Sequence, residues 1–378
     1  MIKILYLVDG YPSRDSYANI FIKNQITLIR EAGFNVGVLI IDIRSIRKIR
    51  RFGFYKEISE GIPLYKLSIP WGPLFKILGQ NIANYLALKL FKKVLSDFGQ
   101  PDIIHSHFGE MGILGAALKL KYNIPLIITE HGSIMLPSKY SHKRKQRVVR
   151  KAYRFCDKLI AVSDYLAKHI KSPSIPEVIV IPNFIPNYFF VDASFKSVNK
   201  NKRVISVGNL QKNKRFDMTI SVFARICERV NDISLIIIGK GPCYNELVKL
   251  TKEKKIDDKV FFYQHVPNTE MPKYYRESLC FILLSEYETF GVSIAEALAC
   301  GIPAIATKCG GPEEIITSDN GLLVPVNDEQ AAYEAILNMY YNHGKYNPHM
   351  LSADIRARFG QDNFLSKITE VYHSILKK

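Results

Sequence analysis

The fold of this chain is decided by one stretch, LSEYETFGVSIAEALACGIP, which occupies residues 284–303. The apolar run that ends at Ser285 predicts a buried strand. The apolar spacing after Gly291 predicts a helix that stops at Gly301, because glycine readily takes the left-handed conformation that ends helices. A strand, a loop and a helix in this order predict one βα unit of a parallel sheet.

The same alternation recurs on both sides of this stretch. In the first half, apolar runs predict strands at 2–7, 36–41, 103–105, 126–129, 158–162 and 178–181, and helices at 20–31, 75–96, 111–120 and 165–170. A second series of strands is predicted at 204–207, 234–238, 260–262, 280–284, 304–307 and 322–324. We therefore predict an α/β protein with two Rossmann-like, doubly wound domains facing each other across a cleft. The expected domains are 1–188 and 204–378, joined by a linker at 189–203, and the final helix, 363–376, could pack on either domain.

Composition agrees with a folded, two-domain protein. The chain has 378 residues, of which 47% are hydrophobic and 23% charged. Its apolar runs are strand-length, far short of the roughly 18 residues that a membrane-spanning helix needs. The first residues enter a strand pattern without a leader, and the six cysteines show no paired spacing. We expect a cytoplasmic protein with reduced cysteines.

The positive charge is concentrated in the first half of the chain. Residues 1–190 hold 28 lysines and arginines against 13 acidic residues, a net of +15, whereas residues 191–378 hold 24 against 22, a net of +2. Two clusters dominate, at Arg44–Arg51 and Lys139–Arg154. An anionic membrane surface explains this asymmetry best, and we expect peripheral association with the inner face of the plasma membrane. The helix at 75–96, with Leu74, Leu78, Ile82 and Tyr85 on one side, could serve the membrane or the core equally well.

The 284–303 stretch also carries chemistry. The amino end of its helix, with free N–H groups beside Gly291, suits a diphosphate. Glu296 lies about five residues into that helix and Glu288 precedes it, so one carboxylate is expected on each side of the phosphates. A carboxylate accepts hydrogen bonds from a vicinal diol, which fits Glu296 to a ribose and Glu288 to a sugar.

These residues resemble the retaining family-4 glycosyltransferases of the GT-B fold. The resemblance rests on Glu288 and Glu296 eight residues apart, followed by Ala297, Gly301, Pro303, Ala306-Thr307 and Gly310-Gly311-x-x-Glu314. It extends over most of the chain through Glu130-His131-Gly132, Val162-Ser163, Pro182-Asn183, Val207-Gly208-Asn209-Leu210 with Lys214, Ile238-Gly239-Lys240-Gly241-Pro242 and Asn320-Gly321.

The resemblance implies the site residues. Those implied to be catalytic are His131, Glu288 and Lys214, and those implied to bind the donor are Gly208, Asn209, Lys214, Phe290, Gly291, Val292 and Glu296. No metal or other cofactor is expected. Two positions depart from the family pattern. Asn209 stands where an arginine is usual, with Lys212 or Arg215 as substitutes, and the first loop, residues 12–19, contains no glycine.

The implied activity is that of a retaining hexosyltransferase. It would move a sugar from a UDP- or GDP-sugar to a saccharide or lipid-linked saccharide during assembly of a bacterial surface polysaccharide. One alternative is epimerisation or hydrolysis of the nucleotide sugar in the same cleft. Another is a basic nucleic-acid-binding protein that uses Tyr140 and Tyr153 to stack on bases, although no nucleic-acid partner is expected. His105 and His107, without a third ligand at suitable spacing, are expected to pack the core or line an acceptor pocket rather than bind a metal.

Overall fold

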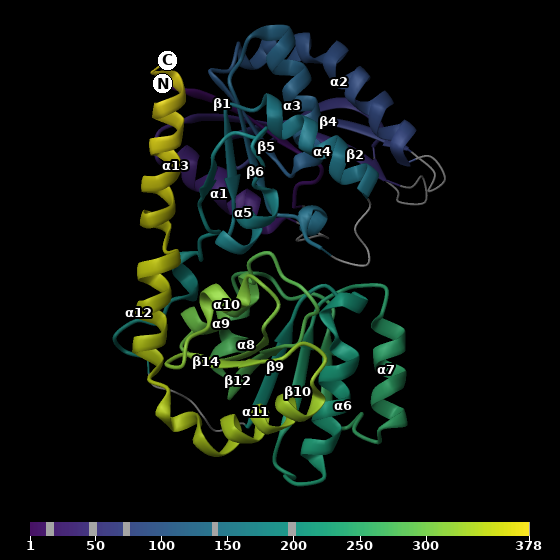
Figure 1. The fold of residues 1–378 in the computed structure, drawn as a ribbon, viewed down its shortest axis with the longest axis vertical. Coiled ribbons are helices and arrows are strands. Elements are labelled where there is room, and N and C mark those ends of the chain that lie inside the picture. Colours follow the sequence, from purple (N-terminus) through teal and green to yellow (C-terminus); the bar gives the residue numbers. More distant parts are fainter. Residues whose placement is uncertain (13–18, 45–50, 71–75, 138–142, 196–201, 378) are drawn as a thin grey trace. The chain divides into compact units, whose positions relative to one another are not determined.

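The computed structural model describes residues 1–12, 19–44, 51–70, 76–137, 143–195 and 202–377. The chain divides into two compact units, which we describe one at a time (Figure 1). The first unit comprises Met1–Pro182 together with Leu365–Lys378, and the second comprises Asn183–Phe364. We expected the first domain to end at 188 and the last helix to have either domain as its partner. The structure starts the second unit at Asn183 and groups the chain from Leu365 onward with the first unit.

The first unit is built on an eight-stranded sheet in the order β3-β4-β2-β1-β5-β6-β7-β8. Every neighbouring pair is parallel except β3 and β4, which form an antiparallel hairpin at one edge. The strands are β1 (Lys3–Val8), β2 (Asn35–Arg44), β3 (Gly53–Ser59), β4 (Ile62–Pro70), β5 (Ile103–His107), β6 (Leu126–Glu130), β7 (Lys158–Ala161) and β8 (Val178–Val180).

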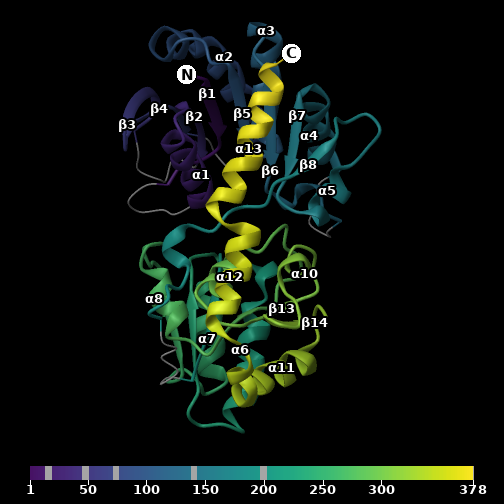
Figure 2. The same ribbon diagram turned by 90° about the vertical axis from the view of Figure 1, so that its left-hand side faces the viewer.

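Helices cover both faces of this sheet (Figure 1). On one face lie α2 (Lys76–Phe98), α3 (Gly109–Tyr122) and α4 (Lys143–Phe155). On the other lie α1 (Ile20–Glu31), α5 (Asp164–Ile170) and the last turns of α13 (Gln361–Leu376), which Figure 2 shows in front of the strands. Because both faces are covered, the central strands β5 and β6 are buried along their whole length rather than at alternate positions.

The second unit contains a six-stranded, fully parallel sheet in the order β11-β10-β9-β12-β13-β14. Its strands are β9 (Arg203–Val207), β10 (Ser234–Ile238), β11 (Val260–Tyr263), β12 (Cys280–Leu283), β13 (Ala304–Thr307) and β14 (Gly321–Val324). Helices α6 (Phe216–Cys227), α7 (Tyr244–Glu253) and α11 (Glu329–Asn342) pack together on one face. The other face carries α8 (Met271–Arg276), α9 (Val292–Ala299), α10 (Pro312–Ile315) and α12 (Pro348–Phe359). Helix α9 contacts each of the other three.

The predicted fold class is confirmed, and each predicted strand is present within a few residues of its expected bounds. The end of α9 is also as predicted: Gly301 has φ +80°, and the amides of Gly301 and Ile302 donate to the carbonyls of Leu298 and Ala297. This is the hydrogen-bond pattern by which a glycine closes a helix.

In the first unit, three elements had no counterpart in the sequence prediction: β3, β4 and α4. In the second unit the sequence prediction gave bounds for α9 but for none of the helices α6, α7, α8, α10, α11 and α12. Strand β3 is largely exposed, so it lacks the apolar run that marks a buried strand. Helix α4 has few apolar residues, and its basic side chains conceal the helical period. Tertiary packing against α3 holds this helix in place.

Candidate active site

The strand order of the second unit reverses between β9 and β12, so the loops that follow these strands diverge at the carboxyl edge of the sheet. This is where open α/β sheets bind ligands. The loop after β9 carries Lys214, in a short 3₁₀ turn, and the loop after β12 carries Glu288. Two residues that are 74 positions apart in sequence therefore come from the two loops at the reversal.

Lys214 and Glu288 form an ion pair in which Nζ lies 2.5 Å from Oε1. The same Oε1 accepts a hydrogen bond from the Ser285 hydroxyl at 2.8 Å. Both charged side chains are mostly buried, with 20% of Lys214 and 11% of Glu288 exposed, so solvent screens the pair only partly. Two of the three residues implied to be catalytic, Lys214 and Glu288, are therefore in contact, and Ser285 joins them although the sequence analysis did not identify it.

The backbone around Glu288 is fixed by the loop after β13. The Glu288 amide donates to the Cys309 carbonyl, and the Glu288 carbonyl accepts from the Gly311 amide at 3.0 Å. A Cβ at Gly311 would lie 2.4–2.5 Å from backbone atoms of Phe290, so only glycine permits this close approach. The loop at Gly310-Gly311 therefore positions Glu288 through backbone contacts alone.

Helix α9 begins directly after this loop. Gly291 precedes it with φ +106°, a conformation that favours glycine, and no side chain caps the helix. The first amides of a helix have no partner within it, so the groups near Val292 remain available to an anion. Phe290 is 2% exposed and packs edge-on against Phe359 at 5.2 Å between ring centroids. Phe290, which the resemblance implied as a donor-binding residue, can therefore contribute only its backbone, because its side chain is buried.

Glu296 lies in the middle of α9 and is only 8% exposed. Its Oε2 accepts a hydrogen bond from the hydroxyl of Tyr275 at 3.0 Å. Burial raises the pKa of Glu296 to about 7, and the Tyr275 hydrogen bond opposes this shift. The carboxyl therefore changes its charge near neutral pH.

The loop after β9 is held against the loop after β10. The amides of Gly208 and Leu210 donate to the carbonyls of Ile238 and Lys240. Asn209 is exposed at the tip of this loop. Of its two possible substitutes, Lys212 is exposed, whereas Arg215 pairs with Asp217 and Asn327.

His131 follows β6 in the first unit and is 7% exposed. Its Nε2 lies 2.8 Å from Nδ1 of His107, at the end of β5, and the two rings stack at 5.1 Å. His105 stacks on His107 and bonds through its two nitrogens to Tyr372 and Thr129. Burial lowers the pKa of His105 to about 3 and that of His107 well below its usual value, so both are neutral at physiological pH.

The expected packing role of His105 and His107 is therefore met by a hydrogen-bonded stack beneath His131. The hydroxyl of Tyr372, on α13, lies 2.9 Å from that of Tyr6 on β1. Nothing in the local sequence around residue 131 indicated these partners, because they come from β1, β5, β6 and α13.

Glu130 fixes the backbone on both sides of this stack. It is fully buried and accepts hydrogen bonds from the amides of Gly109 and Gly132 at 2.8 and 2.6 Å, and from the hydroxyl of Tyr153 at 2.5 Å. Burial raises the pKa of Glu130 to about 7. Tyr153 is wholly buried, so the expectation that it could stack on nucleic-acid bases is wrong, while Tyr140 lies outside the described residues.

The basic cluster at 139–154 is described from Lys143 onward, as α4. Arg144, Val148, Lys151 and Phe155 are exposed and spaced to share one face of the helix. The opposite face, with Val149 and Tyr153, is buried.

Other predicted segments lie partly outside the described residues. These are residues 45–50 of the earlier basic cluster, most of the loop at 12–19, and Leu74. On α2, Ile82 and Tyr85 are exposed.

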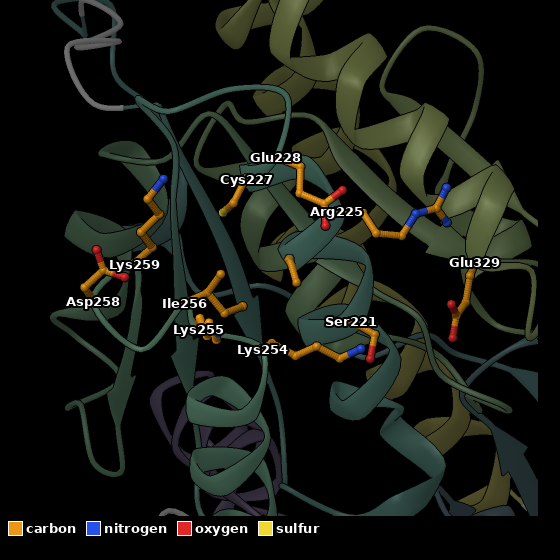
Figure 3. Close-up of a pocket in the computed structure, with 11 residues that line it drawn as sticks. Ser221, Arg225, Cys227, Glu228, Lys254, Lys255, Ile256, Asp258, Lys259 and Glu329 are labelled. Carbon is orange, nitrogen blue, oxygen red and sulfur yellow. The ribbon is translucent and has the colours of Figure 1, made fainter.

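A surface pocket of about 350 Å³ lies at the opposite, amino edge of the second sheet (Figure 3). Ser221, Arg225, Cys227, Lys255 and Glu329 contribute to its lining, and their side chains are spread around its rim. It contains none of the predicted site residues.

In the described part of the chain, no three histidine, cysteine or acidic side chains gather as a metal site would require. Over the same residues, no helix is both long and apolar enough to cross a membrane.

Comparison with known proteins agrees with this geometry. The sequence profile described as "Glycosyltransferase Family 4" matches residues 20–187, and that described as "Glycosyl transferases group 1" matches residues 190–353. The chain is 26% identical over 295 residues to N-acetyl-alpha-D-glucosaminyl L-malate synthase of Bacillus anthracis, covering 73% of this chain and 75% of the relative.

Solved structures show the same architecture. Sucrose-phosphate synthase from Thermosynechococcus elongatus aligns over 100% of both chains with a TM-score of 0.83 and 19% identity. Anabaena HepE in complex with UDP-glucose aligns over 99% of this chain and 100% of its own, with a TM-score of 0.76 and 19% identity. The two Rossmann-like units thus define a protein of the GT-B fold. The chain belongs to the family-4, group 1 glycosyltransferases and is an enzyme of that family.

Proposed function

We propose that this glycosyltransferase moves a hexosyl group from a UDP- or GDP-sugar to a saccharide or lipid-linked saccharide, with retention of anomeric configuration. The observation that carries the donor assignment is the ion pair between Lys214 and Glu288, on the two loops at the strand-order reversal. HepE, which shares the fold, is described in complex with UDP-glucose, which supports a nucleotide-sugar donor here.

The ion pair gives Lys214 a role in binding the diphosphate. Its ammonium group is mostly buried and has Glu288 within 2.5 Å as its counter-charge. A donor diphosphate, together with the amides at the start of α9, would take over part of this interaction. Glu288 would then be free to accept hydrogen bonds from hydroxyls of the transferred sugar, while Ser285 continues to hold its Oε1.

Transfer requires that negative charge developing on the leaving nucleotide be stabilised. Lys214 and the amides near Gly291 are donors already in place for this purpose, and such preorganised donors stabilise a transition state more than flexible ones do. We propose that they act without a metal ion, and that attack and departure occur on the same face of the sugar. We assign no carboxylate as a covalent nucleophile.

His131 is proposed to orient the reacting sugar or the acceptor. His107 lies 2.8 Å away and is itself neutral because it is buried, and its hydrogen bond to Nε2 holds the ring of His131 in one orientation. A ring of fixed orientation presents a sugar hydroxyl with a hydrogen-bonding group at a defined position.

The acceptor is proposed to be presented at an anionic membrane surface, in the assembly of a bacterial surface polysaccharide. The outer face of α4 alternates basic with apolar side chains: Arg144, Val148, Lys151 and Phe155. Such a face attracts acidic lipid headgroups through its charges and inserts its apolar groups at the interface. Helix α4 as a whole holds seven of the 28 lysines and arginines of residues 1–190.

The test is a donor screen followed by product analysis. Thermal stabilisation by a panel of UDP- and GDP-sugars identifies the donor, and NMR of the glycoside formed shows whether the anomeric configuration is retained. We expect Glu288→Gln to lower turnover by two to three orders of magnitude, whereas Glu246→Gln on α7 should leave it unchanged. Donor consumption that yields only free sugar or an epimerised nucleotide sugar would overturn the proposal. Loss of activity in EDTA, restored by Mg²⁺ or Mn²⁺, would overturn its metal-independent part.

A further inference from the structure

Helix α8 brings a buried tyrosine to the carboxylate of α9. Tyr275 is fully buried, and its hydroxyl donates to Oε2 of Glu296 at 3.0 Å. Among the described residues this is the only hydrogen bond that the Glu296 side chain makes to the protein. One oxygen of the carboxylate is therefore held from the inside of the unit.

The other oxygen, Oε1, is in a different environment. It has no hydrogen-bond partner in the protein among the described residues. It is not fully buried either, so it reaches solvent. A carboxylate oxygen has two lone pairs that can accept hydrogen bonds. The side chain thus turns one tethered oxygen inward and one accepting oxygen outward.

Tyr275 is well placed to act as a fixed anchor. Its ring packs against Phe189 and Phe281, with centroids 6.2 and 6.1 Å away. The neighbouring Arg276 donates from Nη2 to the carbonyls of Tyr188, Phe189 and Phe190 at 3.4, 3.3 and 3.0 Å. These contacts hold α8 to residues 188–190 and so fix the position of the Tyr275 hydroxyl.

We propose that Tyr275 is a positioning residue for donor binding, which aims Oε1 of Glu296 at the ribose hydroxyls of the nucleotide by fixing Oε2. The inference rests on the proposed function, since it requires a nucleotide donor at α9. A tyrosine that served only to pair a buried carboxyl would affect folding but would not affect discrimination between ribose and deoxyribose.

The same geometry couples donor binding to pH. The groups that face the Glu296 carboxyl are Tyr275 from α8 and Cys300, directly after α9, and Arg276 lies beside Cys300. A diol donates best to the ionised carboxylate, so donor affinity should rise as pH increases through about 7 and then level off. Without the Tyr275 hydroxyl, which favours the charged form, that rise should move to higher pH.

The experiment measures the affinity of Tyr275→Phe in the full chain for UDP and GDP and for their 2′-deoxy and 3′-deoxy forms. Wild-type protein should prefer the ribonucleotide, and Tyr275→Phe should lose on the order of tenfold in that preference, because one hydrogen bond to a charged group is removed. The Michaelis constant for the donor should rise while turnover at saturation changes less than twofold. Tyr274→Phe, the adjacent tyrosine, is the matched control.

The outcomes separate the two proposals. If Tyr275→Phe keeps the wild-type ribose preference and pH profile while Glu296→Gln loses them, Tyr275 is only structural and the positioning role is wrong. If Glu296→Gln also keeps them, the ribose contact itself is wrong and the donor assignment at α9 falls. Because the readout is a ratio of affinities within one variant, a moderate loss of stability does not imitate either result.

Discussion

The two units place charge differently around their candidate site residues. In the second unit, charged side chains sit at the site: Lys214 pairs with Glu288, and Glu296 turns one oxygen outward. In the first unit, His131 rests on neutral, buried histidines, and most of the positive charge of α4 lies on an exposed face.

This difference follows from what each unit is proposed to bind. A diphosphate is small and highly charged, so a few partly buried cations and helix amides match it. A saccharide offers neutral hydroxyls, which hydrogen-bonding groups of fixed orientation match better than charges do. The exposed basic face of α4 suits an extended anionic surface, where many weak and screened contacts add up.

The comparison can be broken most sharply at Lys214. Lys214→Met removes the proposed cation and should lower turnover, and turnover divided by the Michaelis constant, by about two orders of magnitude each, because the group acts mainly in the transition state. Lys212→Met, at an exposed lysine two residues away, should have little effect. If the Lys212 change were the more damaging in steady-state kinetics, the cation would be misassigned.

The buried carboxylates provide a second test, because each unit has one whose pKa burial raises to about 7: Glu130 and Glu296. Each of these carboxyls binds its proton more tightly in the folded protein than in the unfolded chain. The contribution of each carboxyl to the free energy of unfolding is therefore full below about pH 4.5 and is lost as pH rises through 7. A shift of this size corresponds to about 3 kcal/mol per group at pH 8.

Urea unfolding between pH 5 and 8 measures this loss. Glu296→Gln should flatten the pH dependence with little loss at pH 5. Glu130→Gln should also flatten it, but at a cost in stability, because an amide cannot accept from Gly109, Gly132 and Tyr153 together. An unchanged slope in both variants would show that neither carboxyl titrates near neutral pH.

The smallest expected effect concerns the outer face of α4. Replacing Arg144 and Lys151 by serine should weaken binding to anionic vesicles by about 1 kcal/mol per residue and leave binding to neutral vesicles unchanged. Activity toward a soluble acceptor should stay at the wild-type level. The control changes Lys249 and Lys252 on α7 in the same way. Equal flotation of wild-type protein with neutral and anionic lipid would contradict the membrane proposal.

Much of the candidate site in the second unit could be predicted from sequence because its residues are close together along the chain. Glu288, Gly291 and Glu296 lie within nine positions, so strand, loop and helix periods alone fix their order in space. The contacts of Ser285 and Tyr275 with these carboxylates could not be predicted, since a serine or a tyrosine near a strand has many possible partners. The ion pair between Lys214 and Glu288 was not predicted either, because the family resemblance implied a role for each residue but no contact between them.

The sequence by itself determined that the chain alternates strands and helices twice, that its first half is basic, and that its second half carries Glu288 and Glu296 around the start of one helix. These are local properties, set by apolar period, turn residues and charge. Only the tertiary structure decided that α4 is a helix with one exposed basic face, and that Tyr6, His105, Thr129 and Tyr372 form a network below His131. Those contacts join residues up to 366 positions apart, and hydrogen bonding between buried groups becomes specific only once the sheet order has brought them together.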